Sequence, residues 1–162
     1  MALARPTFFD TSVLLAGMIE IPGSGAAQRL LDAVVAGRLS PVQTAWHCCL
    51  EVYSVSTRLP EEYRLTPADA ARLVEEEILD RFDVLDLPAT GRRELLRAAA
   101  ADRIAGGRVY DSHIAEVAHL GRAHKMITEN RRDFLALLRH GIVVETAAEA
   151  AAALETRSKT RN

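Results

Sequence analysis

Short apolar runs alternate along this chain with longer segments whose apolar residues recur every three or four positions. The short runs predict five strands, at 6–10, 39–42, 82–85, 125–128 and 142–144. The longer segments predict helices, at 12–17, 26–36, 44–59, 66–80, 90–104, 111–120, 130–139 and 147–154. Strands that alternate with helices favour a mostly parallel sheet covered by helices on both faces.

Local signals support several of these boundaries. Gly37 follows the second predicted helix as a C-terminal stop, and Gly121 ends the sixth in the same way. Thr66-Pro67 is typical of a helix start, with threonine as N-cap and proline at the first helical position. The chain shows no internal repeat. We therefore expect one domain over residues 1–155 and a disordered tail over 156–162.

Composition places the chain among soluble globular proteins, because 49% of its residues are hydrophobic and 26% are charged. No apolar run is long enough to span a membrane, and no signal peptide is visible. We therefore expect a cytoplasmic protein without a membrane partner. Cys48 and Cys49 are adjacent in the sequence, which favours two buried thiols over a disulfide.

The formal net charge of −2 does not by itself indicate a nucleic-acid partner, but the charge is unevenly distributed. Residues 61–86 carry a charge of −6, whereas residues 92–140 carry +4. Arginine greatly outnumbers lysine, which suits bidentate phosphate contacts but also follows from genomic composition bias. This asymmetry is compatible with RNA binding and is only weak support for it.

Four polar positions stand out from the solvated helix faces that explain most of the acids. Asp10 and Asn130 follow predicted strands, Asp111 begins a predicted helix, and Glu51 lies within a largely apolar helix. In parallel α/β sheets, ligand sites gather beyond the carboxyl ends of the strands. Buried carboxylates in a group imply a cation, and oxygen ligands suit Mg²⁺ or Mn²⁺ better than zinc.

Each of these positions could also have a purely structural role. Asp10 and Asp111 could serve as helix N-caps, and for Asp111 taken alone that role is the better supported one. Glu51 could pair with Arg58 on the same helix face. Asn130 could cap the helix that contains Asp133, whose charge would favour the helix start. The residues alone leave both interpretations open.

Four stretches of the chain resemble, in order, the motifs of the PIN-domain family, and within it the VapC-type toxins of toxin–antitoxin pairs. They are Phe-Asp-Thr-Ser-Val-Leu at 9–14, Glu-Val-Tyr-Ser-Val-Ser-Thr-Arg-Leu-Pro at 51–60, Gly-Gly-Arg-Val-Tyr-Asp at 106–111, and Ile-Thr-Glu-Asn-Arg-Arg-Asp-Phe at 127–134. The resemblance runs from Phe9 to Val144. One departure concerns Asn130, since many members of the family have aspartate there, and this puts a second metal site in doubt.

The resemblance implies a PIN-like three-layer α/β/α domain with a mostly parallel five-stranded sheet. It implies a homodimer that cleaves RNA with Mg²⁺ or Mn²⁺ and is neutralised by a small VapB-like antitoxin. Asp10, Glu51 and Asp111 would be catalytic and hold the first metal, with Asn130 and Asp133 as further metal ligands. Hydroxyl donors to these carboxylates would come from Thr11, Ser12 and Thr128. Candidate phosphate contacts are Arg58, Arg108, Arg131 and Arg132.

Three other functions compete with this one. A haloacid-dehalogenase-like phosphatase would need an Asp-x-Asp motif, but residue 12 is serine. A PIN-family nuclease that processes RNA without a toxin role has the same active-site motifs. A catalytically idle PIN domain that serves as a binding module is disfavoured because the three core acids are present.

Overall fold

A five-stranded, entirely parallel sheet forms the centre of the computed structural model, which describes residues 4–160. The strands, in sequence order, are β1 (Thr7–Phe9), β2 (Val42–Ala45), β3 (Asp83–Leu85), β4 (Lys125–Ile127) and β5 (Val143–Glu145). Across the sheet their order is β3-β2-β1-β4-β5. The predicted fold class is therefore confirmed, with every strand pair parallel.

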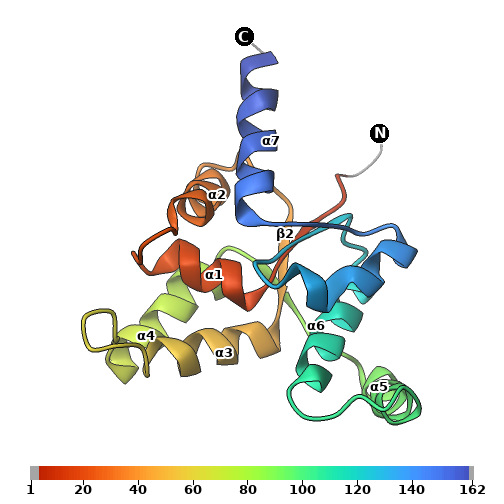
Figure 1. The fold of residues 1–162 in the computed structure, drawn as a ribbon. Coiled ribbons are helices and arrows are strands. Elements are labelled where there is room, and N and C mark those ends of the chain that lie inside the picture. Colours follow the sequence, from red (N-terminus) through yellow and green to blue (C-terminus); the bar gives the residue numbers. More distant parts are fainter. Residues whose placement is uncertain (1–3, 161–162) are drawn as a thin grey trace.

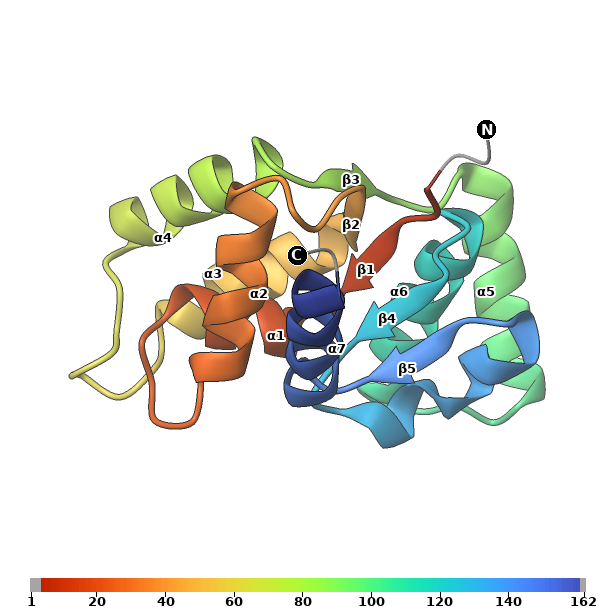
Figure 2. The same cartoon turned by 90° about the horizontal axis from the view of Figure 1, so that it is seen from above.

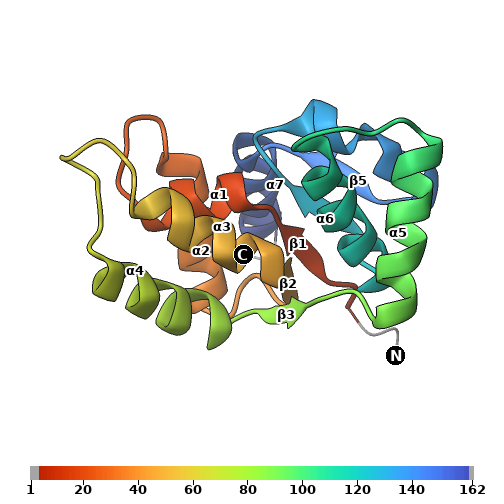
Figure 3. The ribbon, with the colours of Figure 1, turned by 90° about the horizontal axis from the view of Figure 1, so that it is seen from below.

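Helices cover both faces of this sheet, which gives the three layers that the resemblance implied (Figure 1). Their bounds are α1 (Thr11–Met18), α2 (Gly25–Val35), α3 (Trp46–Ser56), α4 (Pro67–Leu73), α5 (Ala89–Ala101), α6 (Arg108–Leu120) and α7 (Ala147–Thr160). A π-helical turn, η1 (Val74–Leu79), continues α4, and a 3-10 helix, η2 (Arg131–His140), precedes β5. Figure 2 shows α2 and α7 over one face, and Figure 3 shows α5 and α6 over the other.

The second strand lies three residues later than its pattern predicted, at Val42–Ala45 instead of 39–42. All four residues are buried, although Gln43 and Thr44 are polar. Both polar side chains find partners across the sheet. Thr44 Oγ1 donates to the carbonyl oxygen of Phe9 at 2.8 Å, and Gln43 Nε2 donates to Asp83 Oδ2 at 3.4 Å. Because a strand buried on both faces shows no alternation, its register was not visible in the apolar pattern.

Several helix boundaries also differ from the prediction, those of α6 and α7 among them. Helix α6 begins at Arg108, three residues before Asp111. Helix α7 continues to Thr160, so the stretch from residue 156 to Thr160 is helical where a tail was expected, and residues 161–162 lie outside the described part. Near its start α7 buries Ala147, Ala150 and Ala151, and this packing anchors a helix whose later turns project away from the body (Figure 1). The predicted stop at Gly37 is confirmed, with φ of +68° directly after α2.

The central position of β1 brings the functional segments together. Phe8 and Phe9 are completely buried, and β1 pairs with β2 on one side and with β4 on the other. The chain runs from β1 outward to β2 and β3, and then crosses back to β4 and β5. Such a reversal opens a crevice at the carboxyl ends of the two strands that flank it, here β1 and β4. No helix within residues 4–160 is both long and apolar enough to cross a membrane.

Candidate active site

Asp10 occupies the crevice at the carboxyl end of β1, where it is only 4% exposed. Its Oδ2 atom accepts hydrogen bonds from Thr128 Oγ1 at 2.7 Å and from Ser12 Oγ at 2.9 Å. Asp10 stands at the N-cap position of α1, but its side chain makes no capping hydrogen bond. The hypothesis that this side chain serves as a helix cap is therefore wrong.

The two hydroxyls that hold Asp10 are themselves held by the backbone after β4. Ser12 Oγ accepts from the backbone N–H of Glu129 at 3.0 Å, and Thr128 Oγ1 accepts from that of Asn130 at 3.0 Å. Each hydroxyl thus accepts a hydrogen bond from a backbone N–H and donates its own hydrogen bond to the Asp10 carboxylate. This network connects the ends of β1 and β4 and orients one oxygen of Asp10. Within the described residues, no side chain donates to the other oxygen, Oδ1.

Glu51 reaches the same crevice from α3. Thr11 Oγ1 donates a hydrogen bond to Glu51 Oε2, and His47 Nε2 lies 3.4 Å from Oε1, one helical turn earlier. Arg58 comes after the end of α3 and is exposed. Within residues 4–160, Glu51 does not pair with it, so the proposed Glu51–Arg58 ion pair is wrong.

Asp111 completes the group from the first turn of α6, whose N-cap is Gly107, so the hypothesis that Asp111 is an N-cap is also wrong. Burial raises the pKa of Asp111, and the negative charges of Asp133, Asp10 and Glu51 raise it further, against the opposing charge of Arg108. Burial also raises the pKa of Asp10, with a contribution from Glu51, although hydrogen bonds from Thr128 and Ser12 oppose it. Four carboxyl groups therefore act on one another at this crevice.

The chemistry of this donor set fits a hard divalent cation. Its members are carboxylates, and Mg²⁺ or Mn²⁺ prefers such oxygens while retaining several waters. Within residues 4–160, no three acidic, histidine or cysteine side chains converge closely enough to form a complete metal cage. Because a magnesium site usually takes only one or two carboxylates directly, a looser, water-filled arrangement remains compatible with it.

The two remaining predicted ligands differ in their placement. Asp133 is exposed in the first turn of η2, and its charge acts on Asp111. Asn130 is exposed before η2 and makes no capping hydrogen bond with its side chain. Only its backbone N–H takes part in the network, through Thr128. The structure thus brings Asp133 to the acids and gives no such contact for the Asn130 side chain.

The four arginines that were predicted to contact phosphate differ in their surroundings. Arg108 is near enough to Asp111 to affect its pKa. Arg131 is instead paired with Glu149 at 2.9 Å. Arg58 and Arg132 are exposed, and within residues 4–160 neither makes an ion pair.

A cluster of rings beside Glu51, formed by His47, Tyr110 and His113, is a feature that the sequence analysis did not identify. The rings of His47 and Tyr110 stack with centroids 4.9 Å apart and planes 18° apart. His113 packs edge-on against His47 at 5.7 Å, and its Nε2 atom lies 3.3 Å from Asp86 Oδ1. The i,i+4 spacing of His47 and Glu51, and the adjacency of Tyr110 to Asp111, were the available signals.

The neighbouring thiols add no nucleophile to this site. Cys48 and Cys49 are buried and unbonded, as the sequence predicted. Burial raises the pKa of Cys48 to about 12 and that of Cys49 to about 11, and the charge of Asp10 acts in the same direction on Cys48. Both side chains are therefore neutral thiols near pH 7.

Comparison with known proteins identifies the family. The family model described as PIN domain matches residues 7–137, which include Asp10, Glu51, Asp111 and Asp133. This chain belongs to the PIN-domain family. The match bears out the motif-based recognition, and it covers the whole region between β1 and η2.

Within this PIN-domain family, the chain is similar to two VapC proteins of Mycobacterium tuberculosis. Ribonuclease VapC27 (strain ATCC 25618 / H37Rv) is 45% identical over 78 residues, which span 48% of this chain and about half, 54%, of VapC27. Ribonuclease VapC40 (strains CDC 1551 / Oshkosh and ATCC 25618 / H37Rv) is 32% identical over 124 residues, or 76% of this chain and 85% of VapC40. These similarities place the chain with the VapC-type members of the family.

A solved structure supports the same fold independently of these names. The crystal structure of PAE2754 from Pyrobaculum aerophilum matches with a TM-score of 0.62 and covers 96% of this chain and 92% of that one. Only 22% of the aligned residues are identical, so the likeness concerns the fold.

Proposed function

We propose that this PIN-domain protein is an endoribonuclease that depends on Mg²⁺ or Mn²⁺ and acts as the toxin of a type II toxin–antitoxin pair. The observation that supports the proposal is that Asp10, Glu51 and Asp111 lie near enough to one another, beside the carboxyl end of β1, for their charges to act on one another. The VapC relatives are named ribonucleases, which supports RNA as the substrate.

The cation would be held by Asp10, Glu51 and Asp111, with Asp133 as the fourth charge. Asp10 is suited to this role because its Oδ2 is taken by two hydroxyls while its Oδ1 receives no side-chain donor. Thr11 would orient Glu51 in a similar way. Since Asn130 is neutral, a second metal would depend mainly on Asp133 for its charge.

When bound, such an ion supplies positive charge at the attacked phosphate and makes water a better nucleophile. The acids hold this charge in place, and the Ser12 and Thr128 hydroxyls keep Asp10 from turning. In-line attack by water would leave a 5′-phosphate and a 3′-hydroxyl. The RNA 2′-hydroxyl would not be the nucleophile in this reaction.

The RNA strand would approach along the exposed rings and arginines beside the acids. Tyr110 is 52% exposed while its ring is stacked on His47, and Trp46, at the start of α3, is 43% exposed. A supported aromatic ring offers a base a stacking surface in any sequence context. We assign phosphate contacts to Arg108, Arg58 and Arg132, and a weaker one to Arg131 because Glu149 competes for it.

The antitoxin proposal follows from the same charges. A crevice lined by carboxylates attracts a guanidinium, so an arginine from a small VapB-like partner would pair with the acids and exclude RNA. The homodimer is proposed from exposed apolar side chains that a second copy would cover, and Leu50, Tyr53 and Leu79 on α3 and η1 are candidates. Sedimentation across micromolar concentrations tests it, and a monomer of 17.7 kDa throughout would contradict it.

The nuclease proposal is tested by incubating the purified protein with single-stranded and hairpin RNA. We expect cleavage with Mg²⁺ or Mn²⁺ and none after exhaustive EDTA treatment. Asp111→Ala should reduce cleavage to background, because it removes a ligand on α6. The matched control is Asp80→Ala, which removes an exposed acid after η1. Cleavage that survives EDTA, or that persists in Asp111→Ala, would contradict the proposal.

The toxin role needs a separate experiment in cells. Induced expression of the protein alone should arrest growth, Glu51→Gln should not, and co-expression of a small partner encoded next to it should restore growth. If wild type and Glu51→Gln leave growth equally unchanged while RNA cleavage in vitro holds, the function would be RNA processing without a toxin role. If neither arrest nor cleavage occurs, the fold would act as a binding module.

A further inference from the structure

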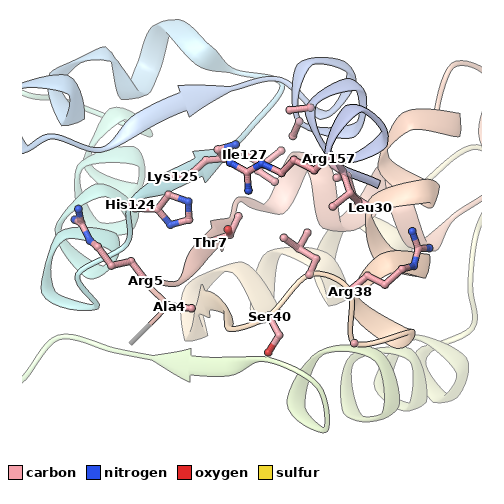
Figure 4. Close-up of a pocket in the computed structure, with 15 residues that line it drawn as sticks. Ala4, Arg5, Thr7, Leu30, Arg38, Ser40, His124, Lys125, Ile127 and Arg157 are labelled. Atoms are coloured by element: carbon pink, nitrogen blue, oxygen red, sulfur yellow. The ribbon is translucent and has the colours of Figure 1, made fainter. Parts of the chain in front are cut away.

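A second site lies beside the beginnings of β1 and β4, away from Asp10 at the carboxyl end of β1. There a cavity of about 900 Å³ opens between α2, α7 and the beginnings of β1 and β4 (Figure 4). Thr7 and Lys125, which pair across these two strands, both line it. None of the acids of the candidate active site lines the cavity. Asp10 is three residues beyond Thr7, or about 10 Å along the strand.

The wall of this cavity is cationic. Arg5, Arg38, Lys125 and Arg157 line it, together with His124, and among the described residues 4–160 no aspartate or glutamate does. This is unusual in a chain whose formal net charge is −2. Figure 4 shows that these side chains come from different sides of the opening, namely the N-terminal segment, the turn after α2, β4 and α7.

Most of this charge is not neutralised by neighbouring residues. Lys125 Nζ pairs with Glu145 at 2.8 Å, and Arg5 donates only to a backbone carbonyl, that of Ala123, at 3.4 Å. Within residues 4–160, Arg38 and Arg157 take part in no ion pair. Arg38 also borders a smaller adjoining cavity that is lined by two acids, Asp32 and Glu155. Glu155 is paired with Arg29 at 3.3 Å, and within residues 4–160 Asp32 makes no ion pair with Arg38.

The deeper part of the cavity is apolar. Leu30 and Ile127 are each 1% exposed, and Leu39, Ala150 and Leu154 extend the same surface. His124 Nδ1 lies 2.9 Å from the carbonyl oxygen of Pro6, which can only accept, so Nδ1 carries the proton. In the tautomer that has its proton on Nδ1, Nε2 is an acceptor for a ligand N–H or O–H. The cavity combines an apolar floor, one oriented acceptor and an exposed cationic rim.

We propose that this cavity binds a nucleoside di- or triphosphate. Its volume is within the roughly 300–1,000 Å³ of small-molecule sites, and the flat base suits the apolar floor. Arginine forks bind phosphate bidentately, and the several negative charges of a polyphosphate match the unpaired cations. A single carboxylate would leave most of those cations unmatched. A bare RNA backbone would fit an extended groove better than a concave cavity with a buried apolar floor.

The test measures binding of ATP, GTP and pyrophosphate by calorimetry, in EDTA so that no metal can bridge a phosphate to the acids. We expect ATP or GTP to bind, and pyrophosphate to bind roughly tenfold more weakly because it lacks the base. The Arg38→Ala/Arg157→Ala variant should weaken nucleotide binding by roughly tenfold or more, since each charged hydrogen bond contributes about 1.5–3 kcal/mol. Its matched control is Arg93→Ala/Arg139→Ala, two exposed arginines on α5 and η2 that do not line the cavity.

Ala153→Trp provides a second variant that keeps every charge and fills the cavity, and it should also abolish binding. Absence of binding by either nucleotide at about 5 mM would overturn the proposal, since so weak a site has no specific affinity. Equal binding of pyrophosphate and ATP would overturn it as well, as would an equal loss in the control pair. Binding of a single-stranded RNA oligomer, without binding of any nucleotide, would overturn the proposal and assign the cations to RNA instead.

Discussion

The carboxyl ends of β1 and β4 gather negative charge, whereas the beginnings of the same strands border a cavity with a cationic wall. The acidic end is partly buried and rigid, because hydroxyls from Ser12 and Thr128 hold Asp10 and backbone amides hold those hydroxyls. At the basic end the arginines are exposed and extend from three separate segments.

The acidic end holds its charges partly buried, whereas the basic end holds its charges exposed to solvent. Burying like charges together raises the free energy of the folded state until a cation relieves it, so the acidic end should respond to metal both in stability and in activity. Exposed arginines are solvated, so the basic end should change the stability little when its charges are removed. Substitutions at each end can break or sharpen this comparison.

The largest effect is expected from removing the hydroxyls that orient Asp10. In Ser12→Ala/Thr128→Val we expect RNA cleavage to fall by about a hundredfold, since partners of metal ligands are each worth roughly 10–100-fold. A higher Mn²⁺ concentration should restore part of the activity, because the loss lies in metal binding. Ser54→Ala/Thr90→Val makes the same chemical change at exposed positions and serves as control. Unchanged activity and metal affinity would show that the acidic end does not need its rigid support.

The next effect concerns stability, measured by thermal melts with and without metal. Wild type should gain about 2.7 kcal/mol in the free energy of unfolding when Mg²⁺ or Mn²⁺ is present at a hundred times its dissociation constant. Asp10→Asn should gain much less, while in EDTA its melting temperature should equal or exceed that of wild type. The amide oxygen can still accept from Ser12 and Thr128, and one repelling charge is gone.

Arg38→Gln is the corresponding change at the basic end, and its stability should match wild type with and without metal. A destabilised Asp10→Asn in EDTA, together with a normal metal response, would make Asp10 a structural residue. The comparison between the two ends would then fail.

A smaller effect is expected at the ring cluster, which extends the acidic end toward the substrate. Tyr110→Ala should raise KM for RNA by about tenfold, because stacking of one base contributes about 1–3 kcal/mol. Tyr110→Phe keeps the ring and should behave as wild type, and Tyr63→Ala, at a tyrosine between α3 and α4, serves as the control. Steady-state kinetics distinguish this from a defect in the acids, which would lower kcat. A fall in kcat with an unchanged KM would contradict a stacking role.

The smallest effect is the pH dependence of stability in EDTA. Burial and neighbouring charge raise the folded-state pKa of Asp10 and Asp111, so the folded protein holds these protons more tightly than the unfolded chain. Their contribution to stability is present below the ordinary pKa of aspartate and is lost as the pH rises through the raised values. Asp86 and Glu149, whose pKa values are lowered, act in the opposite direction.

The difference between wild type and Asp10→Asn isolates the contribution of Asp10 from those opposing groups. Denaturant melts between about pH 4 and pH 7 should show that the free energy of unfolding of the variant increases relative to that of wild type as the pH rises. If the difference in stability between Asp10→Asn and wild type does not vary with pH, then ionisation of the Asp10 carboxyl does not destabilise the folded protein.

Much of this organisation could be predicted from local patterns. The strands could be predicted because short apolar runs such as Phe8-Phe9 are typical of strands buried on both faces. The end of α2 could be predicted because glycine readily adopts a positive φ, as Gly37 does. The acids were recognised by their order along the chain and by their places at strand and helix ends. The family match over residues 7–137 agrees with that order.

Other features could not be predicted because they join distant segments. Glu51 contacts Thr11 and His47 and not Arg58. The contact with Thr11 depends on how α1 and α3 pack together. The strand register at β2 depends on Thr44 and Gln43 finding partners on neighbouring strands. The stacking of His47 on Tyr110 joins two helices that are more than fifty residues apart in the sequence.

The sequence by itself determined which elements form and which of them end in an acid, because helix and strand periodicity follow from the covalent geometry of neighbouring residues. Only the tertiary structure decided that Asp133, and not the Asn130 side chain, lies near Asp111, that Arg131 pairs with Glu149, and that a cationic cavity exists. The cavity wall is drawn from residue 5, residue 38, residues 124–125 and residue 157, which no local pattern connects. Their proximity follows from the parallel sheet order and from the packing of α7 against α2, both of which are long-range interactions.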